Sequence, residues 1–142
     1  MDRVHSLAEI NDRFAIADLY DRQLAAAEAW DFALYDTTFA ANAEIDLSDF
    51  GVPPQRYPAY RAWLASLAPS MPRAQRLTGG LRLELRGDEA TTRVPVVCYV
   101  PVERDGIRTL TTTGLFYNDR LRRTADGWRI VARREELGWS GA

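Results

Sequence analysis

Apolar residues recur at helical intervals in the N-terminal part of the chain. The segment Ser6-Leu7-Ala8-Glu9 is a capping box, in which a serine hydroxyl accepts from a first-turn amide and a glutamate reaches back. The helix that it opens is predicted to run to about Ala29. Its apolar side contains residues spaced three, four or seven positions apart, namely Ile10, Phe14, Ala17, Leu24 and Ala27.

Two more helices and a short strand are predicted before the middle of the chain. The second helix is expected over Trp30–Phe39, and the third opens at Pro58, since proline suits the first helical turn. Between them Glu44–Ser48 alternates between apolar and polar residues and predicts a strand. The segment Asp49–Tyr57 contains a glycine and two prolines and predicts a loop.

The second half of the chain changes to the two-residue period of strands. Leu81, Leu83 and Leu85 alternate with charged residues, so this strand has one apolar face. The next predicted strand covers residues 90–102 and is apolar on both faces over residues 94–102. Because both faces of this strand need cover, we expect a homodimer through the sheet face.

The end of the chain predicts two unusually long strands. Asp105-Gly106 is a hairpin turn signal, and the segments RTLTTTGLFYNDRLRR and WRIVARREELGW follow, joined by TADG. Strands of this length, against about five to six residues in a typical strand, favour a strongly curved antiparallel sheet. The last segment carries charges on both faces, whereas a half-buried strand confines them to one. A polar-lined cavity is therefore expected.

The order of the elements, helices first and consecutive strands afterwards, predicts an α+β fold with the helices on one face of the sheet. The 142 residues contain no repeat or linker and should form a single domain, residues 1–142. A net charge of −2 without a basic block argues against nucleic acid and membrane partners. No signal-peptide pattern is present, and no apolar run approaches the about 20 residues of a membrane span, so we expect a cytoplasmic protein.

The counts of cysteine and histidine exclude several kinds of site. Cys98 is the only cysteine, which rules out an internal disulfide and a cysteine-based zinc cluster. His5 is the only histidine and lies next to the N-terminus, so a Ser-His-Asp triad or a His-rich metal site is not expected. The chain is accordingly expected to use neither a metal nor another cofactor.

Glu28 is the most suggestive candidate for chemistry. It lies eighteen positions after Ile10, which is five helical turns at about 3.6 residues per turn, and so shares the azimuth of that residue. A carboxylate facing the interior at a helix C-terminus is disfavoured by desolvation and by the helix dipole, and both raise its pKa. Such a group suits general acid–base catalysis. The alternative is a frayed helix end that leaves Glu28 in solvent.

Three more charged residues are candidates for the same site. Arg133 and Glu135 share one face of the last strand, and Arg76 begins the first long stretch of strand. If these groups converge with Glu28 on the concave side of the sheet, they form a network of paired interior charges. Alternatively, they form surface ion pairs on a solvated strand face.

Further residues could line a pocket without a specific signal of their own. Cys98 is expected to be an inert residue in an apolar strand rather than a nucleophile. Threonines on the long strand are also good strand formers. The candidate substrate-binding residues are Tyr20, Gln23, Cys98, Thr111, Thr113 and Tyr117.

Several segments carry a resemblance to a known family. They are IADL at 16–19, WD at 30–31, FAANAEI at 39–45, YRAWL at 60–64, FYNDRL at 116–121 and DGWRI at 126–130. In their order along nearly the whole chain they resemble the SnoaL-like branch of the nuclear transport factor 2-like superfamily. This resemblance implies a cone-shaped α+β barrel, in which a curved antiparallel sheet wraps around the N-terminal helices, with a pocket in the open end and usually a dimer.

The resemblance also implies a type of chemistry. Related enzymes include polyketide cyclases, scytalone dehydratase, hexachlorocyclohexane dehydrochlorinase and ketosteroid isomerase. Several members pair a helix aspartate with a strand histidine, and these positions map to Glu28 and Arg76, while a pocket arginine of the dehydrochlorinase maps to Arg133. Arginine cannot accept a proton at neutral pH, so this chain departs from the histidine-based elimination mechanism.

Two classes of function remain open from the sequence. The first is a cofactor-independent lyase or isomerase, of the cyclase or dehydratase type, that acts on a small apolar ligand resembling a polyketide, terpenoid or steroid. Glu28, or Glu135 if Glu28 faces solvent, would be the base, and Arg76 or Arg133 would stabilise an oxyanion. Epoxide opening by water is a variant of this reading. The second class is a non-catalytic ligand-binding or dimeric interaction domain.

Overall fold

The computed structural model describes residues 1–71 and 73–141. The first helix, α1, spans Leu7–Ala29, as predicted. The capping box is confirmed, since the Ser6 hydroxyl accepts from the Glu9 amide at 3.1 Å and the Glu9 carboxylate accepts from the Ser6 amide at 2.9 Å. The helix ends at Trp30, whose φ of 52° is left-handed and turns the chain away from the helix axis.

The prediction of a second helix over residues 30–39 is wrong in extent. Helix α2 covers only Phe32–Tyr35, and strand β1 already begins at Phe39 and runs to Asp46. The left-handed residue at position 30 separates α2 from α1, and two threonines follow α2. The carbonyl of the second, Thr38, accepts from the Ile130 amide at 2.9 Å, which draws the chain into the sheet. The strand expected over residues 44–48 therefore starts five residues earlier.

The remaining elements follow the predicted order. The loop contains the short helix η1, the strand β2 leads into α3 near the predicted proline, and a second short helix, η2, follows. Their bounds are η1 Ser48–Phe50, β2 Gln55–Arg56, α3 Tyr57–Leu67, η2 Ala68–Ser70, β3 Gln75–Thr78, β4 Arg82–Arg86, β5 Glu89–Arg104, β6 Ile107–Thr124 and β7 Gly127–Gly141. In the described part of the chain, no helix is long and apolar enough to cross a membrane.

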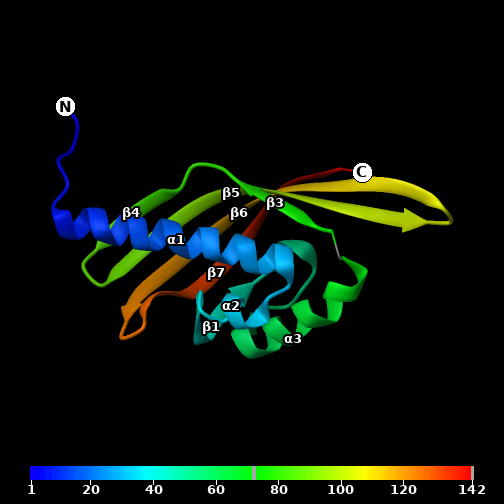
Figure 1. The fold of residues 1–142 in the computed structure, drawn as a ribbon, viewed down its shortest axis with the longest axis horizontal. Helices are drawn as coiled ribbons and strands as arrows, with labels where there is room; N and C mark the ends of the chain where they lie inside the picture. Colours follow the sequence, from blue (N-terminus) through cyan, green and yellow to red (C-terminus); the bar gives the residue numbers. More distant parts are fainter. Residues whose placement is uncertain (72, 142) are drawn as a thin grey trace.

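One curved sheet organises the molecule, with strands in the order β2-β1-β7-β6-β5-β3 and β4 also paired with β5. All pairings are antiparallel except that of β1 with β7. The helices α1, α2 and α3 cover one face of this sheet, and the β5–β6 hairpin projects beyond them as an arm (Figure 1). The predicted α+β architecture with a curved sheet around N-terminal helices is thus confirmed.

A proline separates the two strands, β3 and β4, that pair with β5 opposite β6. Strands β3 and β4 both pair with β5, on either side of Pro95. Proline has no amide hydrogen to offer a partner strand, so the ladder is interrupted there. Instead, the Gly79 amide donates to the Pro95 carbonyl at 2.8 Å. A Cβ at Gly79 would lie 2.7 Å from the Pro95 ring, and this close approach explains the glycine at position 79.

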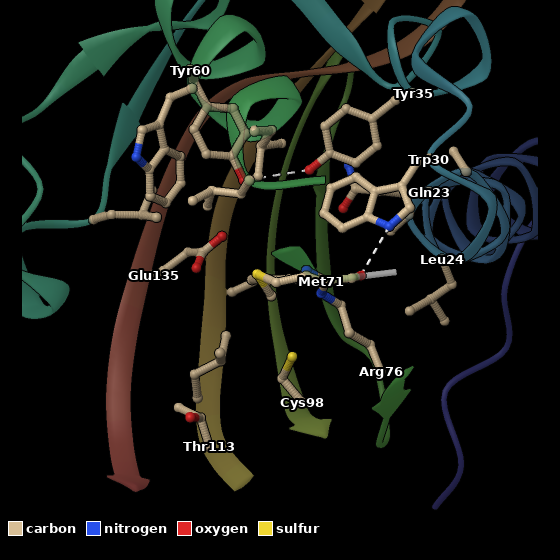
Figure 2. Close-up of a pocket in the computed structure, with 18 of the residues that line it drawn as sticks. Gln23, Leu24, Trp30, Tyr35, Tyr60, Met71, Arg76, Cys98, Thr113 and Glu135 are labelled. Carbon is tan, nitrogen blue, oxygen red and sulfur yellow. Dashed lines mark hydrogen bonds between the residues drawn. The ribbon is translucent and has the colours of Figure 1, made fainter. Parts of the chain in front are cut away.

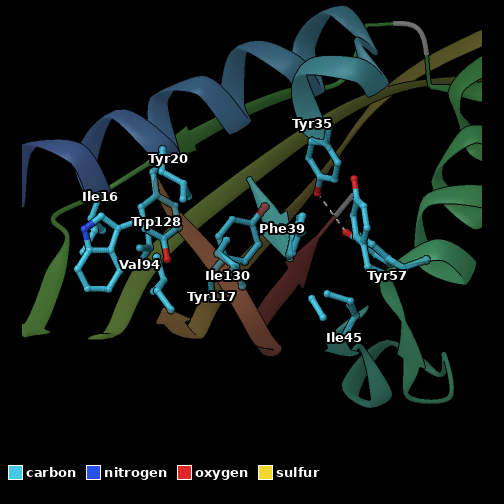
Figure 3. Packing of buried hydrophobic residues seen from close by; sticks show 14 of the residues in the cluster. Ile16, Tyr20, Tyr35, Phe39, Ile45, Tyr57, Val94, Tyr117, Trp128 and Ile130 are labelled. Carbon is cyan, nitrogen blue, oxygen red and sulfur yellow. Dashed lines mark hydrogen bonds between the residues drawn. The ribbon is translucent and has the colours of Figure 1, made fainter. Parts of the chain in front are cut away.

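A bulge in β7 decides which of its residues face the helices. Leu121 pairs with Ile130, but the preceding Arg120 pairs with Ala132, so Val131 is an extra residue. Before the bulge, even-numbered residues such as Trp128 and Ile130 are buried, as Figure 3 shows for the packed core. After the bulge the odd-numbered residues are buried on that face, and these include Arg133 and Glu135.

Candidate functional site

A cavity of about 270 Å³ lies between the concave face of the sheet and the helices. Its volume is slightly below the range of about 300–1,000 Å³ that drug-sized ligands occupy, so it suits a small molecule. Aromatic residues from α2, η1, α3 and the C-terminal cap of α1 form much of the wall: Trp30, Phe32, Tyr35, Phe50, Tyr60 and Trp63. A few polar side chains interrupt this apolar lining, and Figure 2 shows Gln23, Arg76, Cys98, Thr113 and Glu135 among them.

Glu135 is the buried carboxylate of the cavity. The other carboxylate of its wall, Asp31, is exposed and accepts from the Leu34 amide at the start of α2. Glu135 lies on β7 opposite Tyr117 and is 9% exposed. No hydrogen bond or salt bridge joins its side chain to another of the described residues. Burial raises the pKa of Glu135, an effect that the positive charges of Arg133 and Arg76 offset only in part. A buried carboxylate without a partner is costly to the fold, and its raised pKa makes it a better proton acceptor when ionised.

Arg76 supplies a positive charge at the opposite edge of the cavity wall. It lies on β3, with β5 and β6 between it and the strand of Glu135 (Figure 2). Its Nη1 atom is buried and has no hydrogen-bond partner in the described part of the chain. Arg76 and Glu135 form no salt bridge with each other, although each lines the cavity. A ligand between the two strands would therefore meet a hydrogen-bond donor on one side and a carboxylate on the other.

Gln23 contributes a buried polar group from α1. Its Nε2 donates to the Thr38 hydroxyl at 2.9 Å, and that hydroxyl donates in turn to the Tyr35 carbonyl at 2.7 Å. Since the threonine hydrogen is used, the glutamine must be the donor, which fixes the orientation of its amide. The Oε1 atom is left buried without a partner, although Gln23 is only 4% exposed. An unpaired buried acceptor costs about 1–3 kcal/mol.

Beneath the cavity lies a fully buried ion pair between Arg133 and Asp119, and neither side chain is exposed. The guanidinium donates twice to the carboxylate, at 2.9 Å from Nε and 2.8 Å from Nη2. The Tyr20 hydroxyl donates to the same carboxylate at 2.6 Å and is hydrogen-bonded to the Thr92 hydroxyl. These contacts satisfy the carboxylate from two sides, as a buried charge requires.

The same arginine supports the floor of the cavity. Its guanidinium carbon lies 3.7 Å from the ring centroid of Tyr117 and 5.1 Å from that of Phe39. Both distances are within the range of a cation–π interaction, which is stronger where the cation is desolvated. Tyr117 lines the cavity, so Arg133 holds this ring in place. The positive charge of Arg133 lowers the pKa of Glu135, and the negative charge of Asp119 opposes this effect.

The expected inward position of Glu28 is wrong. Glu28 is exposed and does not belong to the cavity wall. It does share the azimuth of Ile10, but Ile10 is itself 39% exposed, and Phe14 is 68% exposed. The buried side of α1 is instead formed by Ile16, Leu19, Tyr20, Gln23 and Ala26. The expected network of four charges is also wrong, because Arg133 pairs with Asp119 and not with a glutamate.

The other candidates divide into residues at the cavity and residues away from it. Thr111 lies beyond the wall, in the β5–β6 arm, and Arg133 lies beneath Tyr117 without lining the cavity. Candidates that line the cavity are Tyr20, Gln23, Arg76, Cys98, Thr113, Tyr117 and Glu135. Their roles in binding or catalysis stay predictions. Within residues 1–71 and 73–141, no three His, Cys, Asp or Glu side chains gather to hold a metal ion.

Comparisons with known proteins identify the family. The sequence model of the SnoaL-like domain matches residues 8–134. Uncharacterized proteins of Mycobacterium tuberculosis and Mycobacterium bovis are 34% identical to this chain over 131 residues, which cover 92% of this chain and 88% of each of theirs.

Solved structures show the same fold at low identity. A Kribbella flavida protein has a TM-score of 0.85 at 23% identity and covers 94% of this chain and 95% of its own. The type 3 hexachlorocyclohexane dehydrochlorinase of Novosphingobium barchaimii has a TM-score of 0.81 at 18% identity, with 95% and 92% covered. A scytalone dehydratase-like protein of Novosphingobium aromaticivorans has a TM-score of 0.81 at 12% identity, with 94% and 88% covered.

The buried pair leads to a prediction for stability. Arg133→Met leaves the Asp119 carboxylate buried without its counter-charge and should lower the free energy of unfolding by about 3–5 kcal/mol in urea denaturation. Adding Asp119→Leu should recover much of this loss, because no uncompensated charge remains. Arg108→Met, which breaks an exposed ion pair with Glu103, is the control and should have little effect. An Arg133→Met protein as stable as this control would contradict the assignment.

Glu135 leads to a prediction for the pH dependence of stability. The pKa of Glu135 is raised in the folded state above its usual value of 4.5. Between these two pKa values the folded protein holds a proton that the unfolded chain has lost, so the free energy of unfolding falls as pH rises through this window. Glu135→Gln cannot ionise and should be more stable than the wild type at neutral pH. The difference should vanish below pH 4.5.

The neighbouring residue provides a matched control of opposite sign. Glu136 points to the other face, and its bond from Arg93 lowers the pKa of Glu136. Its contribution is present at neutral pH and is lost as pH falls through the folded pKa, so Glu136→Gln should be less stable than the wild type at neutral pH. Urea denaturation of both variants over a pH series gives the measurement. Equal effects of the two substitutions would contradict the prediction.

Proposed function

The chain belongs to the SnoaL-like family, and we propose that it is an acid–base catalyst of the lyase or isomerase type for a small, largely apolar carbonyl compound. The observation that carries this proposal is the unpaired Glu135 carboxylate in an aromatic cavity, with the unpaired donor of Arg76 at the opposite edge. The folds of the dehydrochlorinase and of the dehydratase-like protein support the reaction class by analogy.

Glu135 acts as the base. Its carboxylate removes a proton from a carbon next to the carbonyl group. The electron pair of that C–H bond forms a C=C bond to the carbonyl carbon, while the π pair of the C=O bond moves onto the oxygen and gives an enolate. The protonated Glu135 then returns the proton, either to another carbon in an isomerisation or to a leaving hydroxyl group in a dehydration. The apolar walls keep water from competing for the proton.

Arg76 stabilises the charge that develops on the substrate. The enolate oxygen accepts from its guanidinium, which stays protonated throughout and therefore acts as an electrostatic stabiliser and not as a base. The unpaired Nη1 atom of Arg76 provides the hydrogen-bond donor that the enolate oxygen needs. In this proposal the base is Glu135 on the last strand, whereas the sequence resemblance places an acidic residue on the first helix. No metal or organic cofactor takes part.

Loss of proton transfer in Glu135→Gln tests the proposal. Deuterium uptake by 2-indanone, a small apolar ketone, is followed by proton NMR in D₂O in the presence of the protein. Glu135→Gln should lower the protein-catalysed rate by at least about a hundredfold, because general-base catalysis contributes about 10²–10⁴-fold. Arg76→Met should lower the rate without removing binding of the ketone.

Two glutamates outside the cavity serve as controls. Glu136→Gln and Glu28→Gln should leave the exchange rate unchanged, since both side chains lie away from the cavity. Exchange in Glu135→Gln as fast as in these controls would contradict the proposal. If 2-indanone binds but exchanges no faster than in buffer, the cavity belongs to a ligand-binding protein instead.

We also propose a homodimer through the outer face of the sheet. Leu77, Val97, Gly114 and Trp139 lie in one row across four strands of that face. Leu77 is 54% exposed and Trp139 is 52% exposed, so this row presents apolar surface. It continues the apolar stretch of β5 from which the sequence predicts a homodimer.

Sedimentation equilibrium tests the homodimer. The wild type should have twice the 16.0 kDa mass of one chain. Trp139→Lys should shift the mass toward one chain, because it places a charge in the apolar row. Ile107→Lys changes an apolar residue that is 66% exposed on the arm and should leave the mass unchanged. A wild type of one-chain mass at micromolar concentration would contradict the proposal.

A further inference from the structure

Gln23 has no part in the proton transfer described above, yet it places an unused acceptor at the wall of the same cavity. We infer that Gln23 selects the substrate: the cavity takes a carbonyl compound that also carries a hydroxyl or N–H group, whose hydrogen is donated to Gln23 Oε1. This inference rests on the proposed function only in taking the cavity as the substrate site.

The amide of Gln23 is held in one orientation before any ligand arrives. Its Nε2 is tied to the Thr38 hydroxyl, and the Thr38 carbonyl is in turn tied to the Ile130 amide of β7. Thr38 is fully buried, so water does not compete for the hydrogen bond that holds the Gln23 amide. A rigid acceptor loses little conformational freedom when it binds a ligand donor, which favours selectivity.

The hydroxyl hydrogens of Tyr20 and Thr38 are used elsewhere in the fold. That of Tyr20 goes to Asp119, and that of Thr38 goes to the Tyr35 carbonyl. Neither can satisfy Gln23 Oε1 without breaking a bond inside the fold. A donor on the ligand meets the need directly.

Beside the Glu135 base, two unpaired groups of opposite type, on Arg76 and Gln23, define the ligand class. Arg76 offers only donors and so binds an acceptor such as a carbonyl oxygen, whereas Gln23 Oε1 accepts only from a donor. The aromatic wall accommodates the hydrocarbon skeleton between them. A site built to accept from a substrate hydroxyl discriminates strongly against the analogue that lacks it, because the buried acceptor then stays unpaired.

Matched pairs of small ketones test the inference by isothermal titration calorimetry. The probes are 3- and 4-hydroxyacetophenone and the 3- and 4-methylacetophenones, in which a methyl group of similar size replaces the hydroxyl. The wild type should bind at least one hydroxyl compound about tenfold or more tightly than its methyl partner. Equal binding within both pairs, or no binding of either hydroxyl compound, would overturn the inference.

Gln23→Met keeps the length of the side chain and removes the acceptor. In this variant the preference for the hydroxyl compound should disappear, while the methyl compound should bind as well as before or better. Gln75→Met changes an exposed glutamine next to Arg76 on β3 and should keep the wild-type preference. A hydroxyl preference that persists in folded Gln23→Met would also overturn the inference. If Gln23→Met fails to fold, the same pairs are titrated into Glu135→Met, which removes the other unpaired acceptor of the cavity. A hydroxyl preference that persists in Glu135→Met supports the inference, and its loss there would overturn it.

The outcome is separable from that of the proposed function. The preference is a binding measurement and does not require turnover. A hydroxyl preference that depends on Gln23 without any effect of Glu135→Gln on proton exchange would overturn the proposed catalysis and support this inference. Exchange that depends on Glu135, together with equal binding of the hydroxyl and methyl compounds, would support the proposed catalysis and overturn this inference.

Discussion

Arg133 carries a full positive charge at a position where its side chain has no contact with solvent, and the concave face of the sheet depends on how that charge is compensated. Taking such an ion out of water costs several kcal/mol even after relaxation. The cost is offset by the two bonds to Asp119 and by the rings of Tyr117 and Phe39. These partners come from β6 and β1, so the charge ties three adjacent strands to one geometry.

That geometry depends in turn on one extra residue in β7. With the hairpin register continued from Leu121 and Ile130, position 133 would face the convex side of the sheet. The bulge at Val131 brings both Arg133 and Glu135 to the concave side. Arg133 is paired with Asp119 through Nε and Nη2, with only its Nη1 atom lacking a partner, whereas Glu135 is left at the cavity without a partner among the described residues. The same local irregularity therefore creates a stabilising contact and the candidate base.

The order of the elements and the α+β class were predictable because they follow from long periodic segments and strong turn signals. The position of Glu28 was not, because the inward side of α1 is decided by packing against the sheet, and alanines and exposed apolar residues blur the stripe. Asp119 was missed because its pairing with Arg133 depends on the bulge. Inward residues of the straight part of β6, such as Thr113 and Tyr117, followed from simple alternation. The break that leaves α2 short was not predictable, because the left-handed residue before it is Trp30 and not a glycine.

The distribution of satisfied and unsatisfied polar groups separates the concave face into two parts. In the buried network the Asp119 carboxylate and the hydroxyls are paired, and of the Arg133 guanidinium only Nη1 has no partner in the described part of the chain. At the cavity, Arg76 Nη1 and Gln23 Oε1 are buried without a partner, and the Glu135 side chain makes no hydrogen bond or salt bridge to the described residues. Folding alone selects against such atoms, since pairing or apolar replacement would be more stable. The presence of Glu135, Arg76 and Gln23 around one aromatic cavity is the arrangement expected where a ligand supplies the missing partners, and it keeps these groups available at a cost in stability.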